Sequence, residues 1–180
     1  MKKVMCVLLL PLVVVSGLVF ANRENDIETA KRPAPKPLSV AEKEEAMKQW
    51  LTTPGGIQYQ KWEASPAGKK VYASEAKIRR HTREFTPTEA VVTSLFLPPG
   101  SRLGFGVMVS IEGEAYILSF GAEQAKEFEA LRRLKVADKI VVRSRHVSHA
   151  PKYAYAIVAG DHVERGSKLI YKRAPRKGGC

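Results

Sequence analysis

A run of basic residues between positions 132 and 152 is the part of this sequence best suited to bind a ligand by charge. Asp138 is the one acidic residue among seven cations, which are Arg132, Arg133, Lys135, Lys139, Arg143, Arg145 and Lys152. Lys139, Arg143 and Arg145 occupy alternate positions of an expected strand, so their side chains would project from one side and could follow a phosphate backbone. Tyr153 and Tyr155 follow closely and could stack on bases. The pattern is therefore suited to bind a polyanion, and the alternatives are a protein partner or a charged surface without a partner.

The histidines do not indicate catalysis. His146 and His149 are three residues apart on the same expected strand, so they would lie on opposite faces as loop or surface residues and would not converge on a metal. His81 and His162 have no serine or cysteine nucleophile motif beside them. We therefore expect a protein with no catalytic residues, no metal site and no cofactor.

A twelve-residue repeat is the most distinctive pattern outside the basic run. Trp50–Gly56 aligns with Trp62–Gly68, and each copy contains a hydroxyl residue followed by proline. A hydroxyl residue is a good N-cap, and proline is tolerated at the first helical position. A capping box at Ser39–Glu42 marks the start of an earlier helix. Residues 39–85 should therefore form an arm of three helices, over about 40–51, 54–64 and 66–83.

This arm must cover its apolar side chains, because two repeats are too few to form a self-supporting solenoid. The side chains concerned are Trp50, Ile57, Tyr59, Trp62, Val71, Tyr72 and Ile78. Two alternatives remain open: they pack on the C-terminal part of the same chain, or they dock on a partner protein. Aromatic residues, tryptophan above all, are typical anchors of protein interfaces, so Trp50, Tyr59, Trp62 and Tyr72 are the candidate partner-binding residues.

From residue 86 onward, alternating apolar residues predict strands. We expect strands over 89–97, 104–111 and 114–120, a helix over 122–134, then strands over 138–148 and 153–159, with a sixth over 168–172. Glu112 and Gly113 would form a tight hairpin. The expected class is α+β or mainly β.

This order of elements in residues 86–173 resembles the oligonucleotide/oligosaccharide-binding (OB) fold, a small barrel of five to six strands with a helix between strands three and four. The resemblance implies a ligand surface on strands two and three and on the loops 98–103 and 149–152. These loops contain Arg102 and Lys152, so Arg102 joins the candidate polyanion-binding residues. A small SH3-like barrel is the alternative, and the helix over 122–134 would distinguish the two.

The first 21 residues have the layout of a secretory signal peptide. Lys2 and Lys3 precede an uncharged apolar run, which ends in small residues before Asn22. The alternative is an uncleaved membrane anchor, since the run is close to the minimum length for a span. Cleavage would lower the formal charge from +12 to +10. We therefore expect a periplasmic or secreted protein.

Two low-complexity segments flank the expected domain. Residues 22–38 are a proline-rich linker, and residues 174–180 are a basic tail that ends at Cys180. Cys180 is the single cysteine after the leader, so it could form only an intermolecular disulfide or remain inert.

The sequence thus predicts an exported, non-catalytic binding module that serves a protein partner or the assembly of an envelope or secretion system. The alternative is a periplasmic protein that binds single-stranded nucleic acid or another polyanion, in DNA uptake or conjugative transfer. Contact with a membrane is expected only if the leader is retained. The sequence does not assign an oligomeric state.

Overall fold

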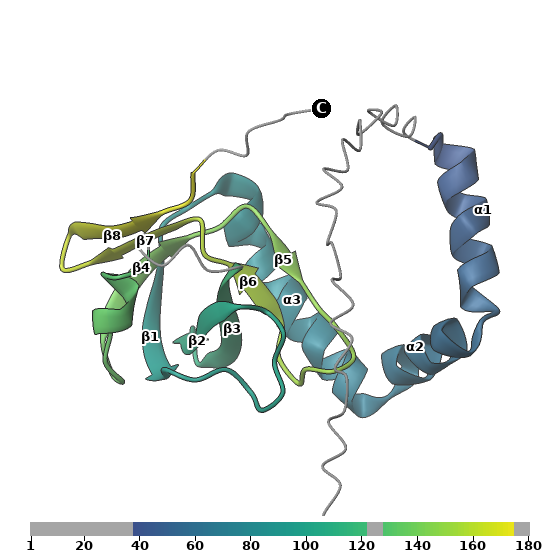
Figure 1. Ribbon diagram of the computed structural model, residues 1–180, viewed down its shortest axis with the longest axis horizontal. Coiled ribbons are helices and arrows are strands. Elements are labelled where there is room, and N and C mark those ends of the chain that lie inside the picture. Colours follow the sequence, from purple (N-terminus) through teal and green to yellow (C-terminus); the bar gives the residue numbers. More distant parts are fainter. Residues whose placement is uncertain (1–37, 122–127, 175–180) are drawn as a thin grey trace, which may run out of the picture. The chain divides into compact units, whose positions relative to one another are not determined.

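The computed structural model describes residues 38–121 and 128–174, and it begins with three helices followed by a sheet (Figure 1). The helices are α1 (Val40–Leu51), α2 (Pro54–Ala64) and α3 (Pro66–Glu84). The expected helices over 40–51, 54–64 and 66–83 are confirmed, as is the capping box between Ser39 and Glu42. Within the described ranges, no helix is both long enough and apolar enough to span a membrane. The expected leader, almost all of the proline-rich linker and most of the basic tail lie outside these ranges.

The two helix breaks have the same hydrogen bonds, which explains the repeat. Thr53 Oγ1 accepts from the amide of Gly56 at 3.2 Å and donates to the carbonyl of Trp50 at 2.6 Å. Ser65 Oγ makes the equivalent bonds to Gly68 at 3.1 Å and to Trp62 at 2.6 Å. Each hydroxyl therefore ends one helix and caps the next.

The last glycine of each repeat is required by close packing at the break. A β-carbon on Gly56 would overlap the carbonyl oxygen of Trp50, and one on Gly68 would overlap that of Trp62. Gly55 has no such neighbour, since a β-carbon there would meet its nearest atom at 3.9 Å. Only the last glycine of the repeat lets the backbones of two successive helices approach this closely.

In the described ranges, eight strands follow the helices and form one mixed sheet, in the order β5-β6-β3-β2-β1-β4-β7-β8. Their bounds are β1 (Thr88–Ser94), β2 (Phe105–Ile111), β3 (Glu114–Gly121), β4 (Lys139–Arg143), β5 (Val147–Ser148), β6 (Ile157–Ala159), β7 (His162–Arg165) and β8 (Lys168–Lys172). The pair β3–β6 is parallel, whereas the other pairs are antiparallel. Glu112 and Gly113 both have positive φ, at 50° and 80°, as the two-residue hairpin turn between β2 and β3 requires.

The expectation of a closed five- to six-stranded barrel is wrong, because the sheet is open and has eight strands. The expected strand over 138–148 divides into β4, which pairs with β1 and β7, and β5, which pairs with β6. The β7–β8 hairpin occupies the second edge of β4. In the strand order, four strands separate β4 from β5, yet only three residues link the two along the chain. The sheet must therefore curl strongly to bring β5 close to the end of β4.

The expected helix over 122–134 is also not found in its described part. Residues 122–127 lie outside the described ranges, and residues 128–133 form a turn and a short 3-10 helix, Leu131–Arg133. Phe128, Leu131 and Leu134 are nevertheless buried, as their spacing indicated. They pack in the main core beside an aromatic group that includes Phe105, Phe120 and Tyr171.

Helix α3 covers part of the sheet and fixes the base of the arm (Figure 1). Val71 and Ile78 enter the main core, and the buried Tyr116 on β3 donates its hydroxyl to the carbonyl of Ser74 at 3.0 Å. Ion pairs at the helix surface reach the β2–β3 hairpin, from Lys77 to Glu114 at 2.6 Å and from Arg80 to Glu112 at 2.7 Å. The last of the three helices is thus part of the folded domain.

Candidate binding surfaces

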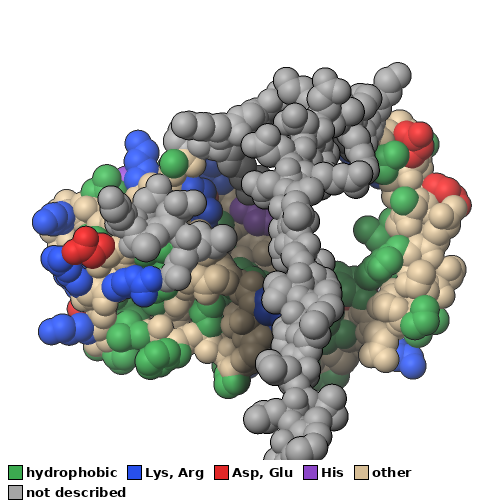
Figure 2. Space-filling model, in the orientation of Figure 1, with side chains coloured by type: hydrophobic (Ala, Val, Ile, Leu, Met, Phe, Trp, Pro, Cys, Tyr) green, Lys and Arg blue, Asp and Glu red, His purple; other side chains and the backbone are tan. Residues whose placement is uncertain are grey.

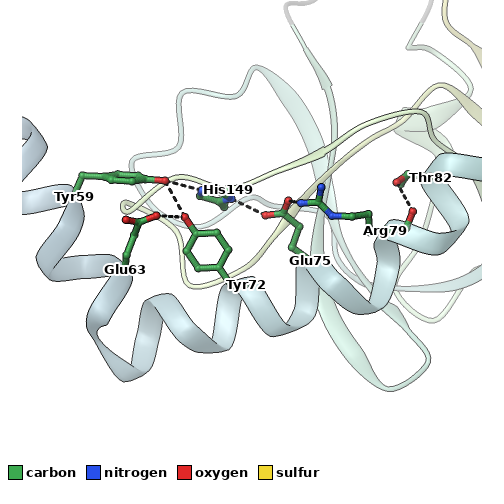
Figure 3. Close-up of polar contacts among 7 residues, drawn as sticks. All are labelled: Tyr59, Glu63, Tyr72, Glu75, Arg79, Thr82 and His149. Atoms are coloured by element: carbon green, nitrogen blue, oxygen red, sulfur yellow. Dashed lines mark hydrogen bonds and ion pairs between the residues drawn. The ribbon is translucent and has the colours of Figure 1, made fainter. Parts of the chain in front are cut away.

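The aromatic residues of α2 and α3 converge on His149, which follows β5 (Figure 3). The indole of Trp62 stacks on the imidazole with ring centroids 5.7 Å apart and an interplanar angle of 23°. The ring of Tyr72 lies 4.5 Å from the imidazole, and the Tyr59 hydroxyl lies 2.9 Å from its Nε2. We call this group, Tyr59, Trp62, Tyr72, Glu75 and His149, the aromatic junction.

A continuous chain of hydrogen bonds runs through the junction (Figure 3). The Tyr72 hydroxyl donates to the Glu63 carboxylate, and the two tyrosine hydroxyls are 2.9 Å apart. Tyr59 therefore donates to Tyr72 and accepts from Nε2 of His149, while Nδ1 of His149 lies 2.6 Å from Oε2 of Glu75. The donor order that satisfies both hydroxyls requires a hydrogen on Nε2 of His149, while Nδ1 forms the hydrogen bond with the Glu75 carboxyl group.

Burial strengthens the contacts of the junction. Only 5% of the Glu75 side chain is exposed, and its second oxygen accepts from Arg79 on the next turn of α3. Burial is the largest cause that raises the pKa of Tyr72 above its ordinary value, and the hydrogen bond to Glu63 adds to it. Tyr72 therefore stays protonated and remains a donor throughout the physiological range.

The structure separates the four candidate partner-binding residues into two groups. Tyr59, Trp62 and Tyr72 are half-buried and face His149, so they pack on the C-terminal part of the same chain. Trp50 lies at the rim, 41% exposed, with its ring edge-on to Tyr59 at 5.4 Å. Of the four, Trp50 is the residue with most surface left for a partner.

Helix α1 presents further apolar side chains at the surface (Figure 2). None of its residues, all of which the structure describes, is buried. Val40 is 73% exposed and Met47 is 56% exposed, and both line a shallow hollow bordered by Lys43, Glu44 and Lys48. The apolar side chains of the arm were expected to be covered, yet among the described residues those of α1 remain exposed.

The seven candidate polyanion-binding residues lie in three separate places. The first is the pair of loops around Arg102 and Lys152, which are held together: Lys152 Nζ donates to the carbonyl of Gly100. The Tyr153 hydroxyl contacts Ser101 Oγ at 3.2 Å and accepts from the amide of Arg102 at 3.1 Å. These bonds, that of Ser101 first, lower the pKa of Tyr153. Tyr153 is 5% exposed, so its ring fixes the loops and is covered from solvent.

Tyr155 belongs to the same place as Tyr153. It is half-buried and packs against the small core cluster that contains Met108, Ile117 and Tyr153. Lys139 lies in a second place, a hollow of about 530 Å³ over β1, β2, β4 and β7. The charged residues that line this hollow with it are three carboxylates, Glu89, Glu112 and Glu164. The surroundings of Lys139 are therefore acidic.

The third place is the basic hollow, which we define by Arg143, Arg145, His162, Lys172 and Arg173. It has a volume of about 600 Å³, and Figure 2 shows Lys and Arg side chains gathered over the part of the surface that β7 and β8 form. Two of the candidate residues, Arg143 and Arg145, line it. Lys172 and Arg173 were not among the candidates, because the hairpin that delivers them was not expected from the sequence.

His149 and Glu75 were also missed as site residues. His149 was expected at the surface, yet it is half-buried at the centre of the junction. A signal for Glu75 exists in the sequence, since it lies on the apolar stripe of α3 with Val71, Ile78 and Thr82. A carboxylate on a buried stripe requires a charged or donor partner.

The chain matches no known family model, no curated protein and no solved structure. Within the described ranges, no group of three or more His, Cys, Asp or Glu side chains is arranged to hold a metal ion. The function of this chain must therefore be inferred from its own geometry.

Proposed function

We propose that this chain is an exported, non-catalytic binding module that docks a protein partner on α1. The observation that carries the proposal is the uncovered apolar side of α1, with Val40, Met47 and Trp50 all more than two-fifths exposed. Amphipathic helices with such a stripe are commonly recognised by a hydrophobic groove on the partner. Val40 and Met47 are seven residues apart and therefore lie on the same side of the helix.

The aromatic junction supports this proposal because it gives α1 a fixed base. Trp50 contacts Tyr59, and Gln60 donates its side-chain amide to the carbonyl of Leu51 at 3.2 Å, so α1 is joined to α2. Tyr59 and Trp62 in turn join α2 to His149. A helix held at a defined position loses less entropy on binding than a free segment does.

The test compares two double variants of the exported chain in affinity capture from its own envelope. Val40→Gln with Met47→Gln removes the apolar stripe, whereas Glu45→Ala with Gln49→Ala alters the opposite side of α1. Polypeptides captured by the wild type and by the second variant should be lost with the first, at both low and physiological salt. Capture of the same polypeptides in equal amounts by all three proteins would refute the proposal.

A further inference from the structure

The basic hollow brings together cations from two distant segments of the chain. Arg143 and Arg145 come from the end of β4 and the residues after it, and Lys172 and Arg173 come from the end of β8. Asp161 holds both segments, because Oδ2 accepts from the amide of Arg145 at 2.8 Å and Oδ1 accepts from Arg173 Nε at 2.7 Å. The positions of the cations are therefore set by the fold, with one carboxylate among the lining residues.

The guanidinium of Arg145 is held over an aromatic ring, and its donors form no hydrogen bond with another described residue. Its Cζ lies 4.2 Å from the ring centroid of Phe85, the residue that ends α3. Phe85 has φ of 53°, a left-handed conformation that a bulky residue rarely adopts. This conformation ends α3, where the Phe85 amide donates to the carbonyl of His81, and the ring lies beneath the cation.

The charge of the hollow is only partly neutralised. Among the residues that the structure describes, neither the Arg145 guanidinium nor the Lys172 ammonium forms an ion pair, and Arg143 has one 3.7 Å contact, with Glu164. His162 contacts the same carboxylate at 2.7 Å, and Arg173 is paired with Asp161. Within the described part of the chain, two cations without an ion pair and one weakly paired cation therefore face the same space.

The hollow continues into a second hollow of about 400 Å³ that shares Arg145, Asp161 and Arg173. This second hollow is lined by apolar atoms of Leu103 and Ile157, beside His146. An extended ligand could place its anionic groups on the cations and its flat, apolar groups on Arg145 and along the second hollow. Single-stranded nucleic acid combines these two properties, and base stacking on aromatic and guanidinium planes is the usual way such a strand is bound.

We propose that these joined hollows form a binding site for single-stranded nucleic acid, with Arg145 and Lys172 as phosphate contacts and Phe85 as the support for Arg145. This site is separate from the α1 surface and does not depend on it. Tyr153 and Tyr155 pack within the fold, so they are not placed to stack on bases. We assign base stacking instead to the face of the Arg145 guanidinium that Phe85 does not cover.

The test is a titration of a labelled oligothymidylate of about 12 nucleotides with the chain that starts at Asn22, at two salt concentrations. Arg145→Gln with Lys172→Gln should weaken binding about tenfold and lower the slope of log K against log salt by about 1.4, which is about 0.7 for each lost phosphate contact. Lys139→Gln with Lys168→Gln removes the same charge at two positions that do not line the proposed site, so it should change affinity less than about twofold. Lys172→Gln alone, at an exposed side chain, gives the intermediate effect without risk to folding.

An abasic phosphodiester of the same length separates nucleic acid from other polyanions, because it keeps the charge and lacks the bases. It should bind several-fold more weakly than the oligothymidylate. Equal affinity for both strands would overturn the assignment to nucleic acid and leave a site for acidic polymers in general. Equal loss in the two double variants, or no saturable binding by the wild type at low salt, would overturn the site itself.

Discussion

Nδ1 of His149 lies 2.6 Å from Oε2 of Glu75, although the two residues are 74 positions apart in the sequence. The contact joins the segment after β5 to the middle of α3, and the other nitrogen of the same imidazole reaches Tyr59 on α2. One side chain thus links the sheet, the third helix and the second helix. The position of α2, and through it that of α1, depends on this residue.

His149→Ala should therefore destabilise the fold and loosen α2. The change leaves the buried Glu75 with Arg79 alone and removes the ring on which Trp62 stacks, so we expect a loss of about 2–3 kcal/mol in the free energy of unfolding. Urea unfolding measures the loss, and amide hydrogen exchange in α2 measures the loosening. His146→Ala is the matched control, because that side chain is exposed. Equal stability of the two variants would show that the junction does not hold the arm.

The glycine pair Gly55 and Gly56 provides a test of the helix breaks. Gly56→Ala and Gly68→Ala would each force a β-carbon against the carbonyl of a tryptophan, so each should cost about 1–3 kcal/mol. Gly55→Ala should be neutral or stabilising, since its site is open and the second repeat already has Ala67 there. Thermal unfolding of the three variants decides the matter. A Gly56→Ala protein as stable as Gly55→Ala would contradict the account of the repeat.

Asp138 should contribute to stability at neutral pH and lose that contribution in acid. The amide of Lys135 and the guanidinium of Arg165, both 2.9 Å from Oδ2, hold the pKa of Asp138 below its usual range, with the amide as the larger cause. A carboxyl with a lowered pKa in the folded state stabilises the fold above its ordinary pKa, and the effect disappears as the pH falls through the folded value.

Asp138→Asn should therefore be less stable than the wild type at pH 7, and the difference should narrow in acid. Urea unfolding across the acid range tests this, with Glu44→Gln on the exposed α1 as the control that should follow the wild type. A constant difference between Asp138→Asn and the wild type at all pH values would show that the charge of Asp138 does not matter.

The helices could be predicted from the sequence because their signals are local. Ser39, Thr53 and Ser65 cap the three helices, and a proline fixes the start of the second and third. The first three strands were found for a similar reason, since alternation and the Glu112–Gly113 turn are visible in the sequence. The reason for the repeat, close contact between successive helices at Gly56 and Gly68, appears only in the structure.

The rest of the sheet depends on contacts between distant segments. Nothing local shows that residues 139–148 divide between two partners, or that His162–Arg165 pairs with β4 on one side and β8 on the other. The barrel was expected because the order of elements was read without these pairings. The candidate sites also depend on such contacts. Arg145 could be identified from the charge of its segment, whereas Lys172 and Arg173 lie beside it only because β7 and β8 form a hairpin that the sequence did not indicate.

Docking of a protein partner on the apolar side of α1 is tested most directly by site-specific photo-crosslinking. A photoreactive residue is placed at Met47 in one variant of the chain and at Gln49, on the opposite side of α1, in another. Irradiation in the intact envelope should give a discrete crosslinked product from position 47 and little from position 49. Equal labelling from both positions, or a product at 47 that persists when Val40 is changed to Gln, would contradict the claim.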